Sequence, residues 1–187
     1  MNILFLDIDG VLNGYNYFTN FKMRIAFKLY RDFKWINVEK YKDLIESIEL
    51  VDKKKVKILS KIIKENHIHR IIMIGSKRYD FEDYKYRSQN MQMSLLNFYF
   101  LKYGIDISDY TPYITGKSRE DEILKYIHDN QISDNYIILD DEIQLYHKLR
   151  KHVLLTADSV IIKGHPRENT GLKKKHIKES IELFKEV

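Results

Sequence analysis

Short apolar runs alternate with longer amphipathic stretches along the chain, and most of these runs end at a polar residue. The runs lie at residues 2–6, 71–74, 136–139 and 152–155, and each is almost entirely apolar. Uninterrupted runs of this length are typical of strands that are buried on both faces of a parallel sheet. We therefore predict four such strands.

Amphipathic stretches separate these strands and predict helices. Apolar residues recur at helical spacing over residues 53–66, 84–103, 119–129 and 173–184. Strands that alternate with helices predict an α/β fold, namely a doubly wound, Rossmann-like parallel sheet covered on both faces. No internal repeat or linker interrupts the pattern, so we expect a single domain over residues 1–187.

The composition excludes several classes of protein. A chain with 44% hydrophobic and 32% charged residues is not disordered, and one without cysteine has neither disulfides nor Cys-ligated metal. No apolar run approaches the roughly 18–20 residues that cross a bilayer. The apolar N-terminus lacks the basic start of a signal peptide. We expect a soluble, cytoplasmic protein without a membrane partner.

The net charge of +5 is concentrated in two clusters. Residues 52–78 hold nine basic and two acidic residues, and a second basic cluster spans residues 163–178. One interpretation is a set of solvated helix faces. The other is an anionic partner such as a nucleic acid or a nucleotide. The seven histidines show no metal-ligand spacing, and we expect them at the surface.

Candidate chemical groups follow three of the predicted strands. Asp7 and Asp9 follow the first strand, Ser76 follows the second, and Asp140 and Asp141 follow the third. Each alone has a structural explanation as a turn or a helix cap. However, parallel sheets bind their ligands at the carboxyl ends of their strands, where all three groups are expected to lie. Carboxylates that converge there repel one another unless a cation lies among them. Oxygen ligands of this kind suit Mg²⁺.

These segments resemble the motifs of the haloacid dehalogenase (HAD) superfamily. Residues 5–13 (Phe-Leu-Asp-Ile-Asp-Gly-Val-Leu-Asn) are similar to motif I, residues 72–76 to motif II and residues 137–141 to motif IV. Small HAD domains of RNA-repair proteins and phage-type phosphatases give a closer resemblance. It is carried by Ser76-Lys77-Arg78, Thr111-Pro112, Arg119-Glu120-Asp121-Glu122-Ile123, Asp140-Asp141 and Gly171-Leu172.

The resemblance implies an HAD core with a minimal cap, in which residues 14–50 form a flap or small insertion. It also implies a phosphatase whose nucleophile is Asp7, with Asp9 as general acid and base. Mg²⁺ would be held by Asp7, the Asp9 backbone carbonyl and Asp140, and Asp141 would hold it through water or orient Lys117. A carboxylate that attacks phosphorus divides one difficult step into two easier ones.

The remaining site residues follow from the same resemblance. Gly10 permits the turn after Asp9, and Ser76 hydrogen-bonds a phosphoryl oxygen. The basic residue of motif III is Lys117 on general spacing or Arg119 on the Arg-x-x-Glu-Ile pattern, and we favour Lys117. Arg78 contacts a substrate phosphate, since a guanidinium binds phosphate through two hydrogen bonds.

Two alternatives concern the class of function. Response-regulator receivers also combine acidic residues, Ser/Thr and Lys, but in them the acidic pair comes first and the phosphorylated Asp later, an order unlike the present one. An inactive binding module with this fold is disfavoured by the intact candidate residues.

As substrate we favour a nucleotide or a nucleic-acid end, and a small phosphometabolite stays possible. The aromatic and basic residues of 14–50 either pack a small cap or stack bases.

Overall fold

The computed structural model describes residues 1–13, 51–75, 100–133, 135–157 and 171–187 of the chain. These residues form a five-stranded, wholly parallel sheet in the order β3-β2-β1-β4-β5. The strands are β1 (Asn2–Leu6), β2 (Ile68–Met73), β3 (Asp109–Tyr110), β4 (Tyr136–Asp140) and β5 (Val153–Leu155). The chain order reverses on either side of β1, which creates a switch point between β1 and β4, where α/β sheets bind their ligands.

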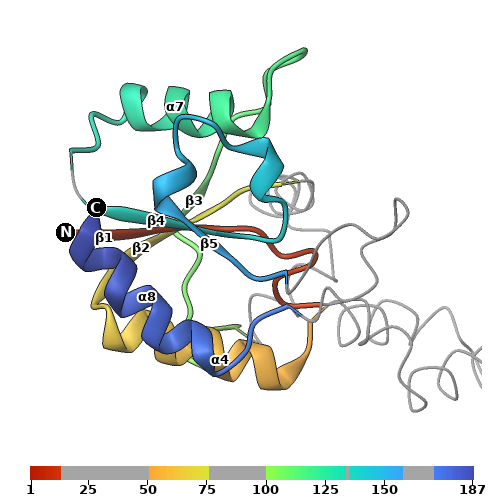
Figure 1. Ribbon diagram of the computed structural model, residues 1–187, viewed down its shortest axis with the longest axis vertical. Coiled ribbons are helices and arrows are strands. Elements are labelled where there is room, and N and C mark those ends of the chain that lie inside the picture. The colour runs from red at the N-terminus through yellow and green to blue at the C-terminus, as the bar shows by residue number, and fades with distance from the viewer. Residues whose placement is uncertain (14–50, 76–99, 134, 158–170) are drawn as a thin grey trace, which may run out of the picture.

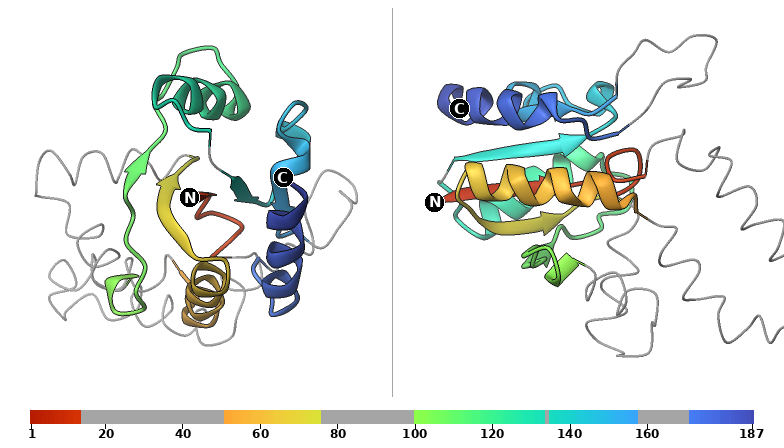
Figure 2. Two further views of the ribbon diagram at one scale, coloured as in Figure 1. Left: turned by 90° about the vertical axis from the view of Figure 1, so that its left-hand side faces the viewer. Right: turned by 90° about the horizontal axis from the view of Figure 1, so that it is seen from below.

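Helices cover both faces of the sheet (Figures 1 and 2). They are α4 (Lys53–Glu65), α7 (Arg119–Asp129) and α8 (Lys175–Glu186), and two short 3₁₀ helices, η1 (Ile143–Leu145) and η2 (Arg150–His152), lie between β4 and β5. Figure 2 shows α4 and α8 side by side on one face and α7 on the other. The fold is therefore an α/β, Rossmann-like parallel sheet, as the sequence predicts.

The central strand β1 contributes side chains to both hydrophobic cores. Leu4 and Leu6 belong to the core under α4 and α8, whereas Ile3 and Phe5 belong to the core under α7. All four side chains have no exposed surface. Successive side chains of a strand point to opposite faces, so a continuous apolar run is what a strand between two helical layers requires.

Capping residues fix where two of the helices begin. Ser118 caps α7 by accepting a hydrogen bond from the Asp121 backbone N–H, and the Asp121 side chain accepts one from the Ser118 backbone N–H. This reciprocal pair satisfies two of the backbone donors that a helix start leaves unpaired. Asp52 caps α4 through a single bond, in which its side chain accepts the Lys54 backbone N–H. The cap of α7 makes Arg119 the first residue of that helix.

Most predicted elements agree with the structure to within three residues at each end. The two-residue strand β3 was not predicted, because a strand so short has no periodicity. The predicted helix at 84–103 and the predicted insertion at 14–50 lie largely or wholly outside the described residues. No helix among the described residues is long and apolar enough to cross a membrane.

The expectation that the histidines lie at the surface was wrong for two of them. His152 is 9% exposed and stacks on Tyr136, and His176 has no exposed surface. His176 accepts a hydrogen bond at Nδ1 from the Lys173 backbone N–H. Its Nε2 lies 3.8 Å from a carboxylate oxygen of Glu179 and forms no hydrogen bond among the described residues, so only one nitrogen of the buried ring is satisfied.

Candidate active site

Two carboxylates meet where the central strands β1 and β4 end. Asp7 follows β1 and donates its backbone N–H to the carbonyl of Leu139 at 3.0 Å, while Asp140 is the last residue of β4. Asp141 follows directly, and one carboxylate oxygen from each of these three aspartates lies within 4.8 Å of the other two. The parallel register of neighbouring strands places these residues at the same height on the sheet edge.

Arg119 connects two of these carboxylates. Its Nη1 donates to Asp7 Oδ2 at 3.0 Å and to Asp140 Oδ2 at 2.5 Å. Its Nη2 lies 4.0 Å from a carboxylate oxygen of Glu142. The first turn of α7 thus places a permanent cation among the acidic residues, and this offsets part of their mutual repulsion.

The carboxylate of Asp140 is fixed by further hydrogen bonds. It is fully buried, and its Oδ2 accepts the hydroxyl hydrogen of Tyr146 at 2.6 Å. Its Oδ1 accepts the backbone N–H of Glu142 at 2.8 Å. Since both oxygens are engaged by donors on the chain that follows β4, the orientation of this carboxylate is set by the protein.

Asp7 is held between its own backbone and the end of β2. Its Oδ1 accepts the Ile8 N–H at 2.9 Å, and the residue is 4% exposed. Gly75 lies against the same oxygen with φ +77°, and a Cβ at Gly75 would collide with Asp7 Oδ1. The position therefore requires glycine for two reasons, its left-handed backbone and its close approach to the carboxylate.

A side-chain amide closes the loop after Asp7. Asn13 accepts the Gly10 N–H at Oδ1 (2.8 Å) and donates from Nδ2 to Asp9 Oδ1 (2.8 Å). Gly10 has φ +74°, a conformation that favours glycine and turns the chain directly after Asp9. The Asp9 carboxylate is therefore oriented by a 4% exposed side chain four residues later.

Burial and crowding change the protonation of the acidic groups. Burial raises the pKa of Asp7 to about 8. The charge of Arg119 acts to lower this pKa, and the charges of Asp140 and Asp141 offset part of that effect. Burial, together with the charges of Asp140 and Glu142, raises the pKa of Asp141 to about 7. Burial also opposes the charge of Arg119, but Asp7 and Asp140 outweigh it and raise the pKa of the guanidinium.

A comparison with protein families shows the family to which the chain belongs. The family described as the HAD domain in Swiss Army Knife RNA repair proteins matches residues 3–163, which is most of the chain. The chain belongs to this family. Comparisons with curated proteins and with solved structures found no match. Membership implies chemistry of the phosphohydrolase type.

The acidic cluster of this HAD domain fits a divalent cation. Asp7, Asp140 and Asp141 offer hard carboxylate oxygens close together. Burial is the largest cause of the raised pKa values of Asp7 and Asp141, and the charge of Asp140 adds to it at both, so a cation bound among them would favour their charged forms. Oxygen donors of this kind are the ligands that Mg²⁺ prefers. The Asp9 carboxylate is not part of this group of three among the described residues.

The two candidates for the basic residue of motif III differ in position. Arg119 contacts the carboxylates, whereas Lys117 is exposed, and its charge acts on Asp121, whose pKa it helps to lower. Lys117 precedes the cap Ser118 and lies outside the helix that carries Arg119 inward. The placement therefore favours Arg119, against the preference drawn from spacing.

The structure describes some of the other predicted residues and adds two that were not predicted. Ser76 and Arg78 lie outside the described residues, directly after Gly75. Sequence reasoning assigned no role to Asn13, although it lies within the motif I segment and an amide after a turn is a recognisable signal. No local sequence pattern indicates Tyr146, because its contact with Asp140 depends on the short helix η1 that lies between them in the chain.

Proposed function

We propose that this HAD domain is a Mg²⁺-dependent phosphohydrolase that acts through an aspartyl-phosphate on Asp7. The observation that carries the proposal is the pairing of buried Asp7 with Asp140 through Arg119 at the switch point of the sheet. A buried carboxylate beside a permanent cation and two further acidic groups suits attack on a phosphoryl group. Positioning and charge neutralisation are the main requirements of that reaction.

The proposed reaction has two steps. An oxygen of the Asp7 carboxylate forms a bond to phosphorus while the bond between phosphorus and the leaving oxygen breaks, and Asp9 donates its proton to that oxygen. Water then attacks phosphorus, Asp9 takes a proton from the water, and the bond to Asp7 breaks to return the carboxylate. The hydrogen bond from Asn13 orients the Asp9 carboxylate for both transfers.

Charge at the site is shared between the protein and a cation. When bound by Asp7, the Asp9 carbonyl, Asp140 and Asp141, Mg²⁺ supplies positive charge that offsets the repulsion between carboxylate and phosphate. Arg119 supplies a second positive group at the same place, with Nη2 lying 4.0 Å from Glu142. In this proposal the guanidinium neutralises a phosphoryl oxygen of the substrate, and Ser76 and Arg78 bind the remaining oxygens.

We propose a terminal phosphate of a nucleic acid or a nucleotide as the substrate. The description of the matched family names RNA repair, and the net charge of +5 favours a polyanion over a neutral molecule that carries a single phosphate. A small phosphometabolite is the competing substrate class. The basic clusters favour the nucleic acid, because a long anionic strand can contact positive charges far from the reacting phosphate and a small metabolite cannot.

A substrate panel tests the proposal. Phosphate release is measured with oligonucleotides phosphorylated at the 5′ or the 3′ end, with mononucleotides and with sugar phosphates, each in Mg²⁺ and in EDTA. We expect turnover in Mg²⁺, loss of turnover in EDTA, and the highest kcat/KM for an oligonucleotide or a nucleotide. Preference for a sugar phosphate would overturn the proposed substrate class. Binding without turnover of any compound would overturn the proposal that the protein is an enzyme.

A further inference from the structure

Lysines occupy the starts of two helices that lie side by side. The first turn of α4 and the start of α8 contain no acidic residue, whereas the first turn of α7 holds three. Apart from the cap Asp52, the charged residues at the two starts are all lysines. We call these the lysine surface: Lys53, Lys54, Lys55, Lys57, Lys173, Lys174 and Lys175.

This placement of charge is unfavourable for helix stability. The N-terminus of a helix is the positive end of its dipole, so cations there are repelled and acidic side chains are favoured. The acidic first turn of α7 follows this rule, and α4 and α8 depart from it. A charge pattern that opposes folding indicates another use for the lysines, and an anion bound across both helix starts would reverse the unfavourable balance.

The two helix starts form one continuous surface. At the starts, the Lys55 ammonium donates to the Leu172 carbonyl at 3.3 Å. At the other end of α4, the C-cap Asn66 donates to the Ser180 hydroxyl at 2.8 Å, so the two helices are in contact along their length. Burial and the nearby charge of Lys173 lower the pKa of Lys55. The repulsion between a lysine of α4 and one that precedes α8 shows that their charges act on the same region.

The lysine surface lies next to the loop that carries Asp9. The Asp52 N–H donates to the Leu12 carbonyl at 2.8 Å, just before α4, and the Leu172 N–H donates to the Val11 carbonyl at 2.9 Å, just before α8. Gly171 has φ +63° and packs so closely on the Val11 and Gly10 carbonyls that a Cβ would collide. The loop from Gly10 to Leu12 thus joins the lysine surface to the carboxylates.

Part of this surface is open to solvent. Lys53, Lys54 and Lys174 are exposed and form no ion pair with any residue of the described ranges. Lys175 lies 3.6 Å from Glu179, so its charge is partly balanced. The exposed lysines are therefore the ones available to an external anion.

We propose that the lysine surface binds the phosphate backbone of a nucleic-acid strand whose terminal phosphate enters the site at Asp7. This inference rests on the proposed function and extends it to the rest of the substrate. A bound anionic membrane is the competing partner, and it binds more strongly where an apolar face lies beside the lysines. Here the apolar faces of α4 and α8 pack into the core, through residues such as Leu59 and Phe184.

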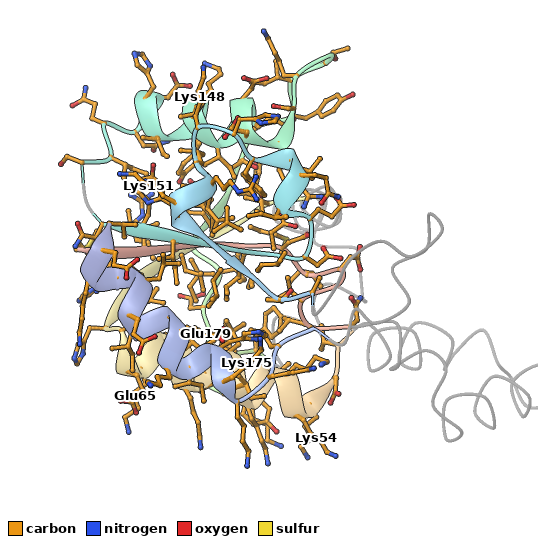
Figure 3. All side chains as sticks on the ribbon, viewed as in Figure 1. Lys54, Glu65, Lys148, Lys151, Lys175 and Glu179 are labelled. Carbon is orange, nitrogen blue, oxygen red and sulfur yellow. The ribbon has the colours of Figure 1, made fainter. Side chains whose placement is uncertain are left out.

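Two double variants with equal charge separate a local surface from net charge. Lys54→Glu with Lys174→Glu alters the lysine surface, and Lys148→Glu with Lys151→Glu is the matched control. Each lowers the net charge from +5 to +1, a change of 2 × 2 charges. Figure 3 shows Lys148 and Lys151 on the other side of the sheet from Lys54 and Lys175.

The measurement is fluorescence anisotropy of an unphosphorylated single-stranded oligonucleotide over a range of salt. We expect the surface variant to weaken binding about tenfold or more at low salt and to reduce the salt slope by about 0.7 for each lost phosphate contact. The control should stay within about twofold of wild type. Turnover of a small aryl phosphate should be unchanged in both variants, and the melting temperature of the surface variant should rise.

Distinct results overturn the inference and the proposed function. Equal weakening of binding in both double variants, or binding to anionic vesicles but not to the oligonucleotide, would overturn the lysine surface as a nucleic-acid site. Loss of binding confined to the surface variant supports the surface. If wild type then released no phosphate from any substrate, the proposed function would be wrong, but the lysine surface would still be supported as a nucleic-acid site.

Discussion

Arg119 donates a hydrogen bond from Nη1 to Asp7 Oδ2 at 3.0 Å, although the two residues lie 112 positions apart in the chain. The same nitrogen also donates to Asp140. The start of α7 therefore supplies the positive charge that two strand ends require. This one contact links the local rules of helix capping to the electrostatics of the candidate site.

Replacing Arg119 should damage both stability and activity. Arg119→Ala leaves Asp7 and Asp140 close together without a protein cation, and removal of one partner of a buried ion pair costs about 3–5 kcal/mol of unfolding free energy. We expect turnover to fall at least a hundredfold. We also expect Mg²⁺ to raise the melting temperature of this variant more than that of wild type.

Lys117→Ala is the matched comparison, two residues away. Its side chain is exposed, so the free energy of unfolding should change by no more than about 0.5 kcal/mol. Turnover should stay close to wild type. A loss of turnover in Lys117→Ala, with Arg119→Ala still active, would contradict the assignment of Arg119 to motif III. Urea unfolding and phosphate release measure the two quantities.

Tyr146 should control how well the site holds its cation. Tyr146→Phe removes the hydroxyl that donates to Asp140 Oδ2 and changes little else in shape. Because groups that orient metal ligands affect affinity by about 10–100-fold, we expect the Mg²⁺ concentration for half-maximal turnover to rise by about tenfold. Saturating Mg²⁺ should restore most of the rate. A variant with unchanged Mg²⁺ dependence would show that this hydroxyl does not position Asp140.

Asn13 should act on turnover through Asp9. Asn13→Ala removes both the acceptor for the Gly10 N–H and the donor to Asp9. We expect kcat to fall about tenfold or more with a smaller change in KM, since the proton donor is no longer oriented. A purely structural role predicts instead lower stability with normal kcat in the folded fraction, so both are measured on the same sample.

His176 should make stability depend on pH. Burial lowers its pKa to about 4, opposed by Glu179 and assisted by Lys175, Lys173 and Lys55. Between an unfolded pKa of about 6.5 and the folded value, the unfolded chain binds a proton at this residue that the folded chain does not, so the contribution of His176 to stability falls as the pH falls through this window. The raised pKa values of Asp7 and Asp141 act in the opposite direction over the same window, so the contribution of His176 is read from a variant. Urea unfolding at pH 7 and pH 5 measures the slope.

His176→Gln provides the comparison for that slope. Glutamine keeps an acceptor for the Lys173 N–H and does not titrate, so the change in unfolding free energy from pH 7 to pH 5 should be more favourable in His176→Gln than in wild type. His152 has a lowered pKa in the same direction and leaves a residual slope. An identical slope in wild type and His176→Gln would contradict this account of the buried imidazole.

The sequence predicts the sheet and the acidic cluster well because both depend on local patterns. β1 and β4 are apolar runs that end in aspartates, and parallel strands bring their ends to one edge. The choice between Lys117 and Arg119 depends instead on where α7 begins. The Ser118–Asp121 capping box makes Arg119 the first residue of that helix, and this signal is present in the sequence.

Contacts between distant segments are harder to predict from the sequence. Tyr146 reaches Asp140 because a 3₁₀ turn reverses the chain after β4, and Gly75 is required by an aspartate on another strand. Neither follows from periodicity or composition. The burial of His176 likewise depends on how α8 packs on α4, which the order of apolar residues alone does not specify.

The role of Asp7 as nucleophile is the central claim, and phosphate release by Asp7→Asn tests it most directly. Wild type and Asp7→Asn are compared on one phosphorylated oligonucleotide and on an aryl phosphate, in Mg²⁺ and in EDTA, after circular dichroism shows that both are folded. We predict Mg²⁺-dependent release by wild type and a loss of at least a thousandfold in Asp7→Asn. Equal rates in the two proteins, or a wild-type rate unchanged by EDTA, would contradict the account.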